Sequence, residues 1–330
     1  MKPRVSVVLT TYNGASRGYL VEAIESVLNQ SYPDYELLIV DDGSDDHTRE
    51  QCSAFLGNSR IRYLYQANKG LAGARNTGIQ ASYGEFICFL DDDDIWKPNK
   101  LQSQIDFIET RLTGIENWGL LFTWLELIDS QGKLISFRGK RDKGSIYKKL
   151  VFENIIGAPS SVLVRRRVLE DIGLFDESLI SSCEDWDLWL RISKKYLVFP
   201  VKDYLVRYRE HQNSMSANFD KMFASAKQVV DKVLTEAPED VSPKAAYASL
   251  YLNRSVVFFA AEEYDRFREF FLRGARLSLR AVRVEHLLLL VLSFSGFKTV
   301  RLLKTLKRDV QKLMIRRRRP VSQLRSGAPG

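Results

Sequence analysis

Short apolar runs alternate with amphipathic stretches along the first third of the chain. Residues 5–9, 35–40, 61–65 and 85–90 are each apolar enough to form a buried strand. Between them, apolar side chains recur at helical spacing over residues 19–28 and 71–82. Strands that alternate with helices in this way form a parallel sheet with helices on both faces. The pattern therefore predicts an α/β fold whose central sheet is mostly parallel.

Polar side chains follow three of these runs at the point where each predicted strand ends. The first run leads into Thr10 and Tyr12, the second into Asp41 and Asp42, and the fourth into four aspartates at positions 91–94. Sheets of this kind bind ligands outside the carboxyl ends of their strands. We therefore expect these polar groups to meet at one edge of the sheet and form a ligand site.

The run of four aspartates has two interpretations. Adjacent carboxylates repel one another, and a hard divalent cation such as Mg²⁺ or Mn²⁺, which accepts oxygen ligands and bridges to phosphates, would offset that repulsion. Alternatively, the run is an acidic loop in which Asp94 caps a helix that begins at Ile95. The position of the run beside the other polar clusters favours the metal site.

The pattern changes beyond this region. Strand-like segments at residues 120–127 and 161–164 belong to a mixed stretch, and from about residue 219 the apolar spacing becomes helical. We therefore divide the chain into a first domain at residues 1–218, a helical region at 219–297 and a tail at 298–330.

Positive charge is concentrated in that tail. Residues 298–319 hold ten Lys or Arg and one acid, so residues 1–297 carry a net charge of −2 although the whole chain carries +8. The apolar run at residues 286–294 is shorter than the ~20 residues that a membrane span needs. Cations interleaved with apolar residues in the tail predict an amphipathic helix on an anionic membrane surface, followed by disorder from residue 321. The alternative is a helix packed on the protein body, and the leucine-rich spacing argues against nucleic-acid binding.

The cysteines indicate the compartment. Cys52, Cys88 and Cys183 match neither a disulfide framework nor a zinc pattern, which is typical of a reducing environment. No signal peptide precedes the first apolar run. We therefore expect a cytoplasmic protein that attaches peripherally to the inner face of the cell membrane.

Several motifs in order resemble those of the family 2 glycosyltransferases, which have the GT-A fold. The motifs span about the first 215 residues and are 5–13 (VSVVLTTYN), 40–44 (VDDGS), 68–76 (NKGLAGARN), 89–94 (FLDDDD), 173–177 (GLFDE), 184–191 (EDWDLWLR) and 208–211 (YREH). The family transfers a sugar, with inversion, from a nucleotide-diphosphate donor to an acceptor hydroxyl. The resemblance implies that the first domain is a GT-A catalytic domain.

The resemblance also implies a donor site at the sheet edge. Thr10, Tyr12 and Asp42 would hold the nucleoside, because a base needs stacking and a partner for its edge; for Asp42 the alternative is a turn that ends the strand. Lys69 and Arg75 lie where a glycine-bearing loop enters a helix, so backbone N–H groups and a guanidinium can approach phosphate there. The alternative is a helix start with a solvated arginine.

The chemistry is assigned to the acidic motifs. Asp91 and Asp93 fit the family's DxD positions, so Asp93 would bind Mn²⁺ or Mg²⁺ directly, Asp91 would reach the ribose or the metal, and His211 would contact the metal or the diphosphate. Glu184 and Asp185 open a predicted helix, where the helix dipole alone favours acids. The resemblance assigns the catalytic base to this pair. We take Asp185 as the base, with Glu184 orienting the acceptor or Asp185.

These assignments predict a metal-dependent glycosyltransferase that uses a nucleotide-diphospho-sugar, with UDP as the expected nucleotide. Its acceptor would be a glycan or a lipid-linked molecule, in polysaccharide, lipid-linked glycan or glycolipid synthesis. The alternative is a nucleotide-sugar-binding or membrane scaffold that has lost catalysis. A nucleotide-dependent dehydrogenase is disfavoured because no GxGxxG follows the first predicted strand.

Overall fold

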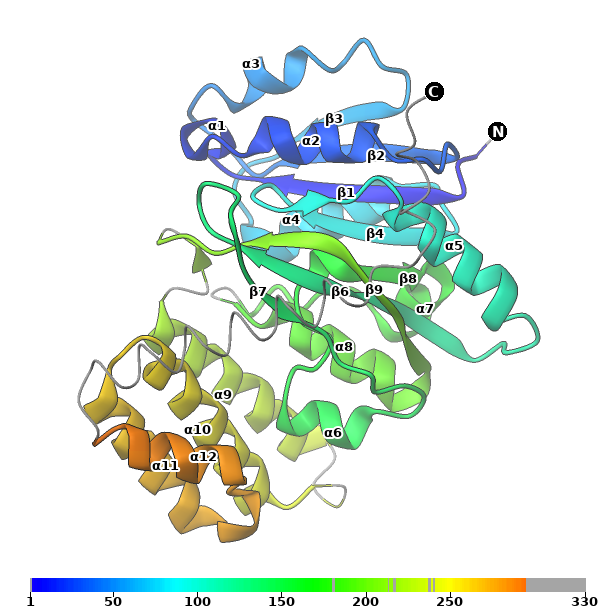
Figure 1. The fold of residues 1–330 in the computed structure, drawn as a ribbon. Coiled ribbons are helices and arrows are strands. Elements are labelled where there is room, and N and C mark those ends of the chain that lie inside the picture. Colours follow the sequence, from blue (N-terminus) through cyan, green and yellow to red (C-terminus); the bar gives the residue numbers. More distant parts are fainter. Residues whose placement is uncertain are drawn as a thin grey trace, which may run out of the picture.

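The computed structural model describes residues 2–179, 182–212, 214–215, 218–236, 239 and 241–294. The predicted membrane helix and the disordered end, at residues 298–330, lie outside these residues, and both stay predictions. Figure 1 shows a sheet-containing body, with the last helices of the chain gathered at one end of it.

A nine-stranded sheet runs through the body in the order β3-β2-β1-β4-β8-β6-β9-β5, with β7 paired to β6. Its first part is parallel, as the apolar runs predicted. This part consists of β3 (Ile61–Tyr65), β2 (Tyr35–Asp41), β1 (Val5–Thr11) and β4 (Phe86–Asp91).

The second part of the sheet is mixed. Its strands are β8 (Val162–Arg165), β6 (Trp118–Ile128), β9 (Leu197–Arg209), β5 (Ile95–Trp96) and β7 (Leu134–Arg138). β6 and β9 are parallel to each other, whereas β8, β5 and β7 are antiparallel to their neighbours. The sequence pattern did not predict β9, because buried and exposed residues follow one another irregularly along it and its register against β6 shifts three times.

Helices cover both faces of the sheet, and the alternation of strand side chains decides which face each residue joins. On β1, Val5, Val7 and Leu9 pack with α2 (Leu20–Leu28) and α5 (Lys100–Arg111) in one apolar cluster. Val8 points to the other face and joins a second cluster with α4 (Gly70–Ala81), α6 (Tyr147–Phe152), α7 (Arg166–Ile172) and α8 (Glu184–Lys195). Two shorter helices, α1 (Gly14–Arg17) and α3 (Thr48–Ser53), complete the first part of the body.

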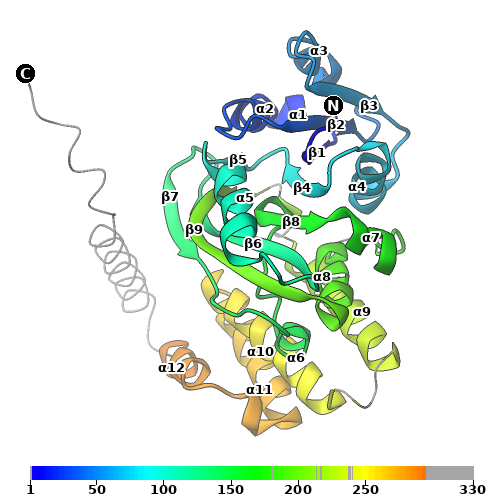
Figure 2. The same cartoon turned by 90° about the vertical axis from the view of Figure 1, so that its right-hand side faces the viewer.

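The C-terminal helices are joined to the body by a shared core. They are α9 (Phe219–Glu236), α10 (Pro243–Ala260), α11 (Tyr264–Leu277) and α12 (Val284–Leu292). Figures 1 and 2 both place them below the sheet, next to α6 and α8. Val229 and Leu250 of these helices belong to the same apolar cluster as Val8 of the first strand. The division of the chain at residue 218 therefore stays a prediction, since the core crosses it.

Candidate active site

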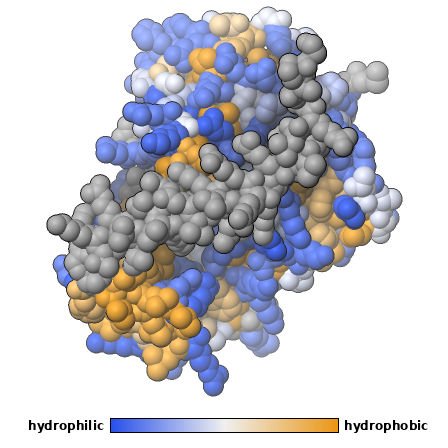
Figure 3. Space-filling model, viewed as in Figure 1, coloured by the Kyte–Doolittle hydropathy of each residue, from blue (hydrophilic) through white to orange (hydrophobic). Residues whose placement is uncertain are grey.

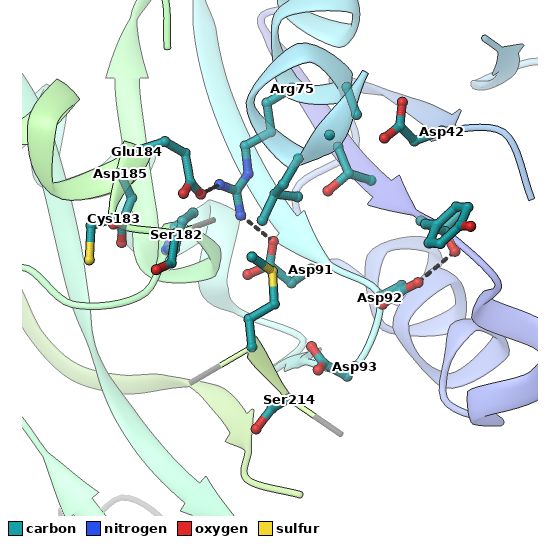
Figure 4. A pocket seen from close by; sticks show the side chains of 18 of the residues that line it. Asp42, Arg75, Asp91, Asp92, Asp93, Ser182, Cys183, Glu184, Asp185 and Ser214 are labelled. Atoms are coloured by element: carbon teal, nitrogen blue, oxygen red, sulfur yellow. Dashed lines mark hydrogen bonds and ion pairs between the residues drawn. The ribbon is translucent and has the colours of Figure 1, made fainter. Parts of the chain in front are cut away.

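The predicted convergence of polar clusters takes place at the carboxyl edge of the sheet. Thr10 on β1 pairs in register with Asp91 on β4, and Thr11 pairs with Asp41 on β2. A cavity of about 410 Å³ opens at this edge. Its wall has Asp42 at one end and Glu184 and Asp185 at the other, with the aspartates of positions 91–93 between them (Figure 4). Tyr12, which follows β1, also lines the cavity.

The end of the cavity at β1 and β2 is formed by buried and exposed groups together. Asp42 is buried, and its Oδ1 accepts hydrogen bonds from Gln66 Nε2 at 2.6 Å and from the backbone N–H of Lys69 at 2.9 Å. Thr10 is buried with an Oγ1 that has no hydrogen-bond partner among the described residues, whereas Tyr12 is 47% exposed. The side chain of Lys69 is not part of the cavity wall, so its contribution in this structure is the N–H that holds Asp42.

Asp41, next to this end, has a structural role. It accepts hydrogen bonds from the Tyr63 hydroxyl and, at 2.8 Å, from the backbone N–H of Ser44. The turn interpretation of this segment thus holds for Asp41, while Asp42 faces the cavity.

The first two aspartates of the acidic run are each held by a different arginine. Asp91 Oδ1 accepts from Arg75 Nη2 at 2.6 Å. Asp92 is buried, and its Oδ2 accepts from Thr11 Oγ1 at 2.5 Å and from Arg17 Nη2 at 2.6 Å. Burial raises the pKa of Asp92 to about 7 in spite of Arg17. The sequence left Asp92 unassigned, and the structure shows that it ties the end of β4 to the end of β1 and to Arg17 at the end of α1.

The last two aspartates contact the end of β9 and the segment that follows it. Asp93 Oδ2 lies 2.9 Å from Nε2 of His211. Asp94 is fully buried and accepts from the backbone N–H of Arg209 at 3.0 Å, and burial raises its pKa well above the usual range. The interpretation of Asp94 as a helix cap was wrong: a short strand follows it at Ile95, and the next helix begins only at Lys100.

Arg75 is the buried centre of the site. It lies within α4 rather than at its start, is 1% exposed, and donates from Nη2 to Asp91 and from Nη1 to Oε1 of Glu184 (Figure 4). Its Nε has no hydrogen-bond partner in the part of the chain that the structure describes. The interpretation of Arg75 as a solvated arginine at a helix start was wrong, because the guanidinium is buried inside α4. Arg75 lines the cavity, and its assignment to phosphate stays a prediction.

Asp185 stands at the far wall of the cavity. It lies in the first turn of α8, directly after Glu184 and after Cys183, whose φ of 66° turns the chain into the helix. Its side chain is only partly exposed. Loss of surrounding water, and then the charge of Glu184, raise its pKa to about 7 although Arg75 acts in the opposite direction. Its Oδ1 accepts from the backbone N–H of Trp186 at 2.6 Å.

The sequence missed groups that reach the cavity from distant parts of the chain. Pocket-lining Arg17, Ser182, Met215 and Met222 carried no signal of their own. Trp189 is fully buried in the core, which agrees with its helical spacing and excludes it as a sugar-stacking surface. Trp186 is largely buried but lines a neighbouring cavity.

The fold is that of the GT-A glycosyltransferases. A structure of TarS residues 1–349 from S. aureus in complex with UDP-GlcNAc has a TM-score of 0.58 to this chain at 19% identity, over 89% of this chain and 79% of that one. The mannosyltransferase PcManGT from Pyrobaculum calidifontis, in complex with GDP-Man and Mn²⁺, has a TM-score of 0.60 at 17% identity, over 92% and 84% of the two chains.

The sequence comparison gives the family. The model of glycosyl transferase family 2 matches residues 6–173. The putative teichuronic acid biosynthesis glycosyltransferase TuaG of Bacillus subtilis is 32% identical over 66% of this chain and 83% of its own. The chain belongs to glycosyl transferase family 2, as its motifs indicated. Its matches to two longer curated relatives span 33% and 42% of the length of those proteins.

Removal of Arg75 is expected to destabilise the protein. The substitution Arg75→Met leaves Glu184 buried without its counter-ion, and breaking a buried pair in this way costs about 3–5 kcal/mol of unfolding free energy. The double variant Arg75→Met/Glu184→Gln recovers part of the loss, because no uncompensated charge remains at position 184. Urea unfolding measures the unfolding free energy of the single and the double variant.

The matched control is Arg273→Met, which breaks an exposed pair with Glu269 and is expected to cost less than about 1 kcal/mol. If Arg75→Met loses no more unfolding free energy than this control, or if the double variant shows no recovery, Arg75 is not the buried counter-ion that Glu184 requires.

Proposed function

We propose that the chain is an inverting, metal-assisted glycosyltransferase that moves a sugar from a nucleotide-diphosphate donor, with UDP as the expected nucleotide, to an acceptor hydroxyl. The observation that carries the proposal is one cavity with nucleoside-type contacts at one end and a carboxyl group of raised pKa, Asp185, at the other. The TarS and PcManGT structures, which contain UDP-GlcNAc and GDP-Man, support a nucleotide sugar as donor.

The nucleoside would bind at the β1–β2 end. Tyr12 offers an exposed ring for stacking on a base. Asp42 is held by two donors through Oδ1, which leaves Oδ2 to accept from a base N–H. The unpartnered Oγ1 of Thr10 is a further polar group at this end.

The donor set of Asp93 and His211 fits a divalent cation. A carboxylate oxygen and an imidazole nitrogen 2.9 Å apart suit Mn²⁺ or Mg²⁺, and Asp91 contributes the oxygen that Arg75 does not take. Among the described residues no group of three or more His, Cys, Asp or Glu side chains is arranged as a metal site. This matches a cation held largely by substrate phosphates and water. When bound, such an ion neutralises the charge of the departing diphosphate.

Asp185 would take the proton of the acceptor hydroxyl. A base with a pKa near 7 combines the deprotonated state with a strong affinity for the proton. Glu184 is engaged by Arg75, so it holds the first turn of α8 in place and keeps negative charge beside Asp185. The placement of Asp185 in the cavity argues against the alternative of a scaffold without catalysis.

A membrane surface is the partner we propose for α12. Val284, Leu287, Leu288 and Val291 on this helix are 50–73% exposed, and Leu279 and Phe294 on either side are 79% and 72% exposed. Figure 3 shows this apolar patch where Figure 1 places α11 and α12. Among the described residues no helix has the length and apolar character needed to cross a membrane. An exposed apolar helix face next to a basic stretch is typical of proteins that lie on anionic lipid. This arrangement suits synthesis of a polysaccharide, a lipid-linked glycan or a glycolipid on the inner face of the cell membrane.

The substitution Asp185→Asn is expected to slow release of nucleoside diphosphate from a donor sugar by about 10²–10⁴-fold, because the base is lost. In the wild type the rate should fall as the pH drops below about 7, where Asp185 becomes protonated. The folded-state pKa is raised, so the ionised carboxylate costs stability at pH 8, and the amide should melt no lower than the wild type there. A wild-type rate in Asp185→Asn would show that another group is the base.

The cation dependence should follow Asp93 and His211. After chelation, Mn²⁺ or Mg²⁺ is expected to restore donor turnover. His211→Ala should raise the Mn²⁺ concentration needed for half the maximal rate by about tenfold or more, since loss of one neighbouring group in a metal site typically costs 10–100-fold in affinity. Asp106→Asn, an exposed acid on α5, serves as the control. An unchanged Mn²⁺ requirement in both His211→Ala and Asp93→Asn would remove these residues from the metal site.

The membrane proposal is tested by adding charge to α12. The double variant Leu288→Glu/Val291→Glu should co-sediment with phosphatidylglycerol-containing vesicles at least about tenfold more weakly than the wild type, because burial of each such side chain contributes about 1.5–3 kcal/mol. Leu56→Glu changes an equally apolar exposed residue, 44% exposed and near α3, and should leave binding intact. Equal co-sedimentation of the double variant would exclude α12 from the contact.

A further inference from the structure

A second cavity lies beside the donor cavity. It has a volume of about 320 Å³ and shares part of its wall with the first, including Asp91, Asp185 and Met222. Its remaining wall comes from the segment after α6, around Glu153 and Gly157, and from one side of α10. Asp185 therefore faces two connected spaces, one of which has none of the nucleoside-binding residues in its wall.

The wall on α10 is fixed to the body of the protein. Asn253 donates from Nδ2 to the backbone carbonyl of Phe152 at 2.6 Å, and Ser249 Oγ donates to the same carbonyl at 3.1 Å. The next residue along α10, Arg254, lines the cavity. These contacts hold the cavity in shape before any ligand enters, which lowers the entropic cost of binding.

Apart from the carboxyl group of Asp185, the charge in the wall of this cavity that lacks an ion-pair partner among the described residues is positive. Glu153 is neutralised by Lys140 at 2.7 Å and by Arg283 at 3.4 Å, and Asp91 is paired with Arg75. By contrast, Arg138 at the end of β7 and Arg254 form no ion pair or side-chain hydrogen bond among the residues that the structure describes. The two guanidinium groups thus offer free donors to a ligand.

Arg254 is also partly desolvated. Burial lowers the pKa of its guanidinium, and the nearby positive charge of Arg266 lowers it further, while the effects of Cys183 and Asp220 are in the opposite direction. Asp220 itself is in contact with Arg266. A half-buried cation without a carboxylate partner is unfavourable in the empty protein, and an incoming anion relieves that cost.

We propose that this second cavity is the acceptor site and that it selects an acceptor carrying an anionic group, a phosphate or a carboxylate, which Arg254 and Arg138 bind while the acceptor hydroxyl faces Asp185. The inference rests on the proposed transferase function and adds the chemical class of the acceptor. It also assigns α10 to the site, although this helix lies beyond the residues matched by the family model.

The test is calorimetric binding to the protein saturated with Mn²⁺ and with UDP or GDP, whichever it binds, so that the donor cavity is occupied. The probes are glucose 6-phosphate and glucuronate, with glucose as the uncharged match. We expect one or both anions to bind at least about tenfold more tightly than glucose, because charge-assisted hydrogen bonds contribute about 1.5–3 kcal/mol each.

The variants test whether anion binding depends on the guanidinium groups of Arg254 and Arg138 or on positive charge elsewhere on the protein. Arg254→Gln and Arg138→Gln should each weaken the anion by about 10- to 100-fold, Arg254→Lys should retain part of the affinity, and Arg276→Gln, an exposed arginine on α11, should change nothing. Thermal melting of each variant confirms that it is folded.

The outcomes distinguish the two proposals. If phosphate alone binds, the acceptor is a phosphorylated molecule, and if the carboxylate alone binds, it is an acidic sugar; either result supports the inference. Glucose binding as tightly as the anions, no probe binding to the nucleotide-loaded wild type, or unchanged affinity in Arg254→Gln and Arg138→Gln would overturn it while the transferase function stands. If neither UDP nor GDP binds, both the acceptor-site inference and the proposed transferase function would be excluded.

Discussion

The site depends on the contacts that hold a dense group of carboxylates together at one edge of the sheet in spite of their mutual repulsion. Each member of the acidic run has a partner on a different element: Asp91 has Arg75, Asp92 has Arg17, Asp93 has His211 and Asp94 has the backbone N–H of Arg209. These partners bring α4, α1 and the end of β9 to the carboxyl end of β4. The charge pattern that suits a cation and a diphosphate is therefore also what fixes the walls of the cavity.

Arg75 carries this constraint across the cavity. Because it contacts both Asp91 and Glu184, the sheet edge and the first turn of α8 are held at a fixed separation, and Asp185 is placed on the far wall. The buried guanidinium of Arg75 lowers the repulsion that Asp91 and Glu184 exert on Asp185, yet Asp185 still has a raised pKa. The same arrangement thus gives an aspartate paired with Arg75 at one wall and a carboxyl group of raised pKa at the other.

The sequence predicted the parallel part of the sheet because β1, β2 and β4 are buried on both faces and read as continuous apolar runs. It also predicted which polar clusters meet, since that follows from parallel topology alone. It could not predict the partners of the aspartates: Arg209 and Asp94 are separated by 115 positions, and β9 has no regular pattern. The buried state of Arg75 and the strand at Ile95 were missed for the same reason, because both are decided by tertiary contacts with distant segments.

The C-terminal helices lie beyond residues 6–173, which the family model matches, but they also contribute to the site. They share the core of the sheet, supply Arg254 to the second cavity and present the apolar face of α12 to the surroundings. The residues that we propose for the donor, the acceptor and the membrane therefore belong to one continuous structure.

The central claim is that the cavity at the carboxyl edge binds a nucleoside diphosphate together with a divalent cation. Isothermal titration of the wild-type protein with UDP and with GDP, each with and without Mn²⁺, tests it most directly. The account predicts that at least one of these nucleotides binds and that Mn²⁺ raises its affinity. No heat of binding for either nucleotide, with or without Mn²⁺, would contradict it.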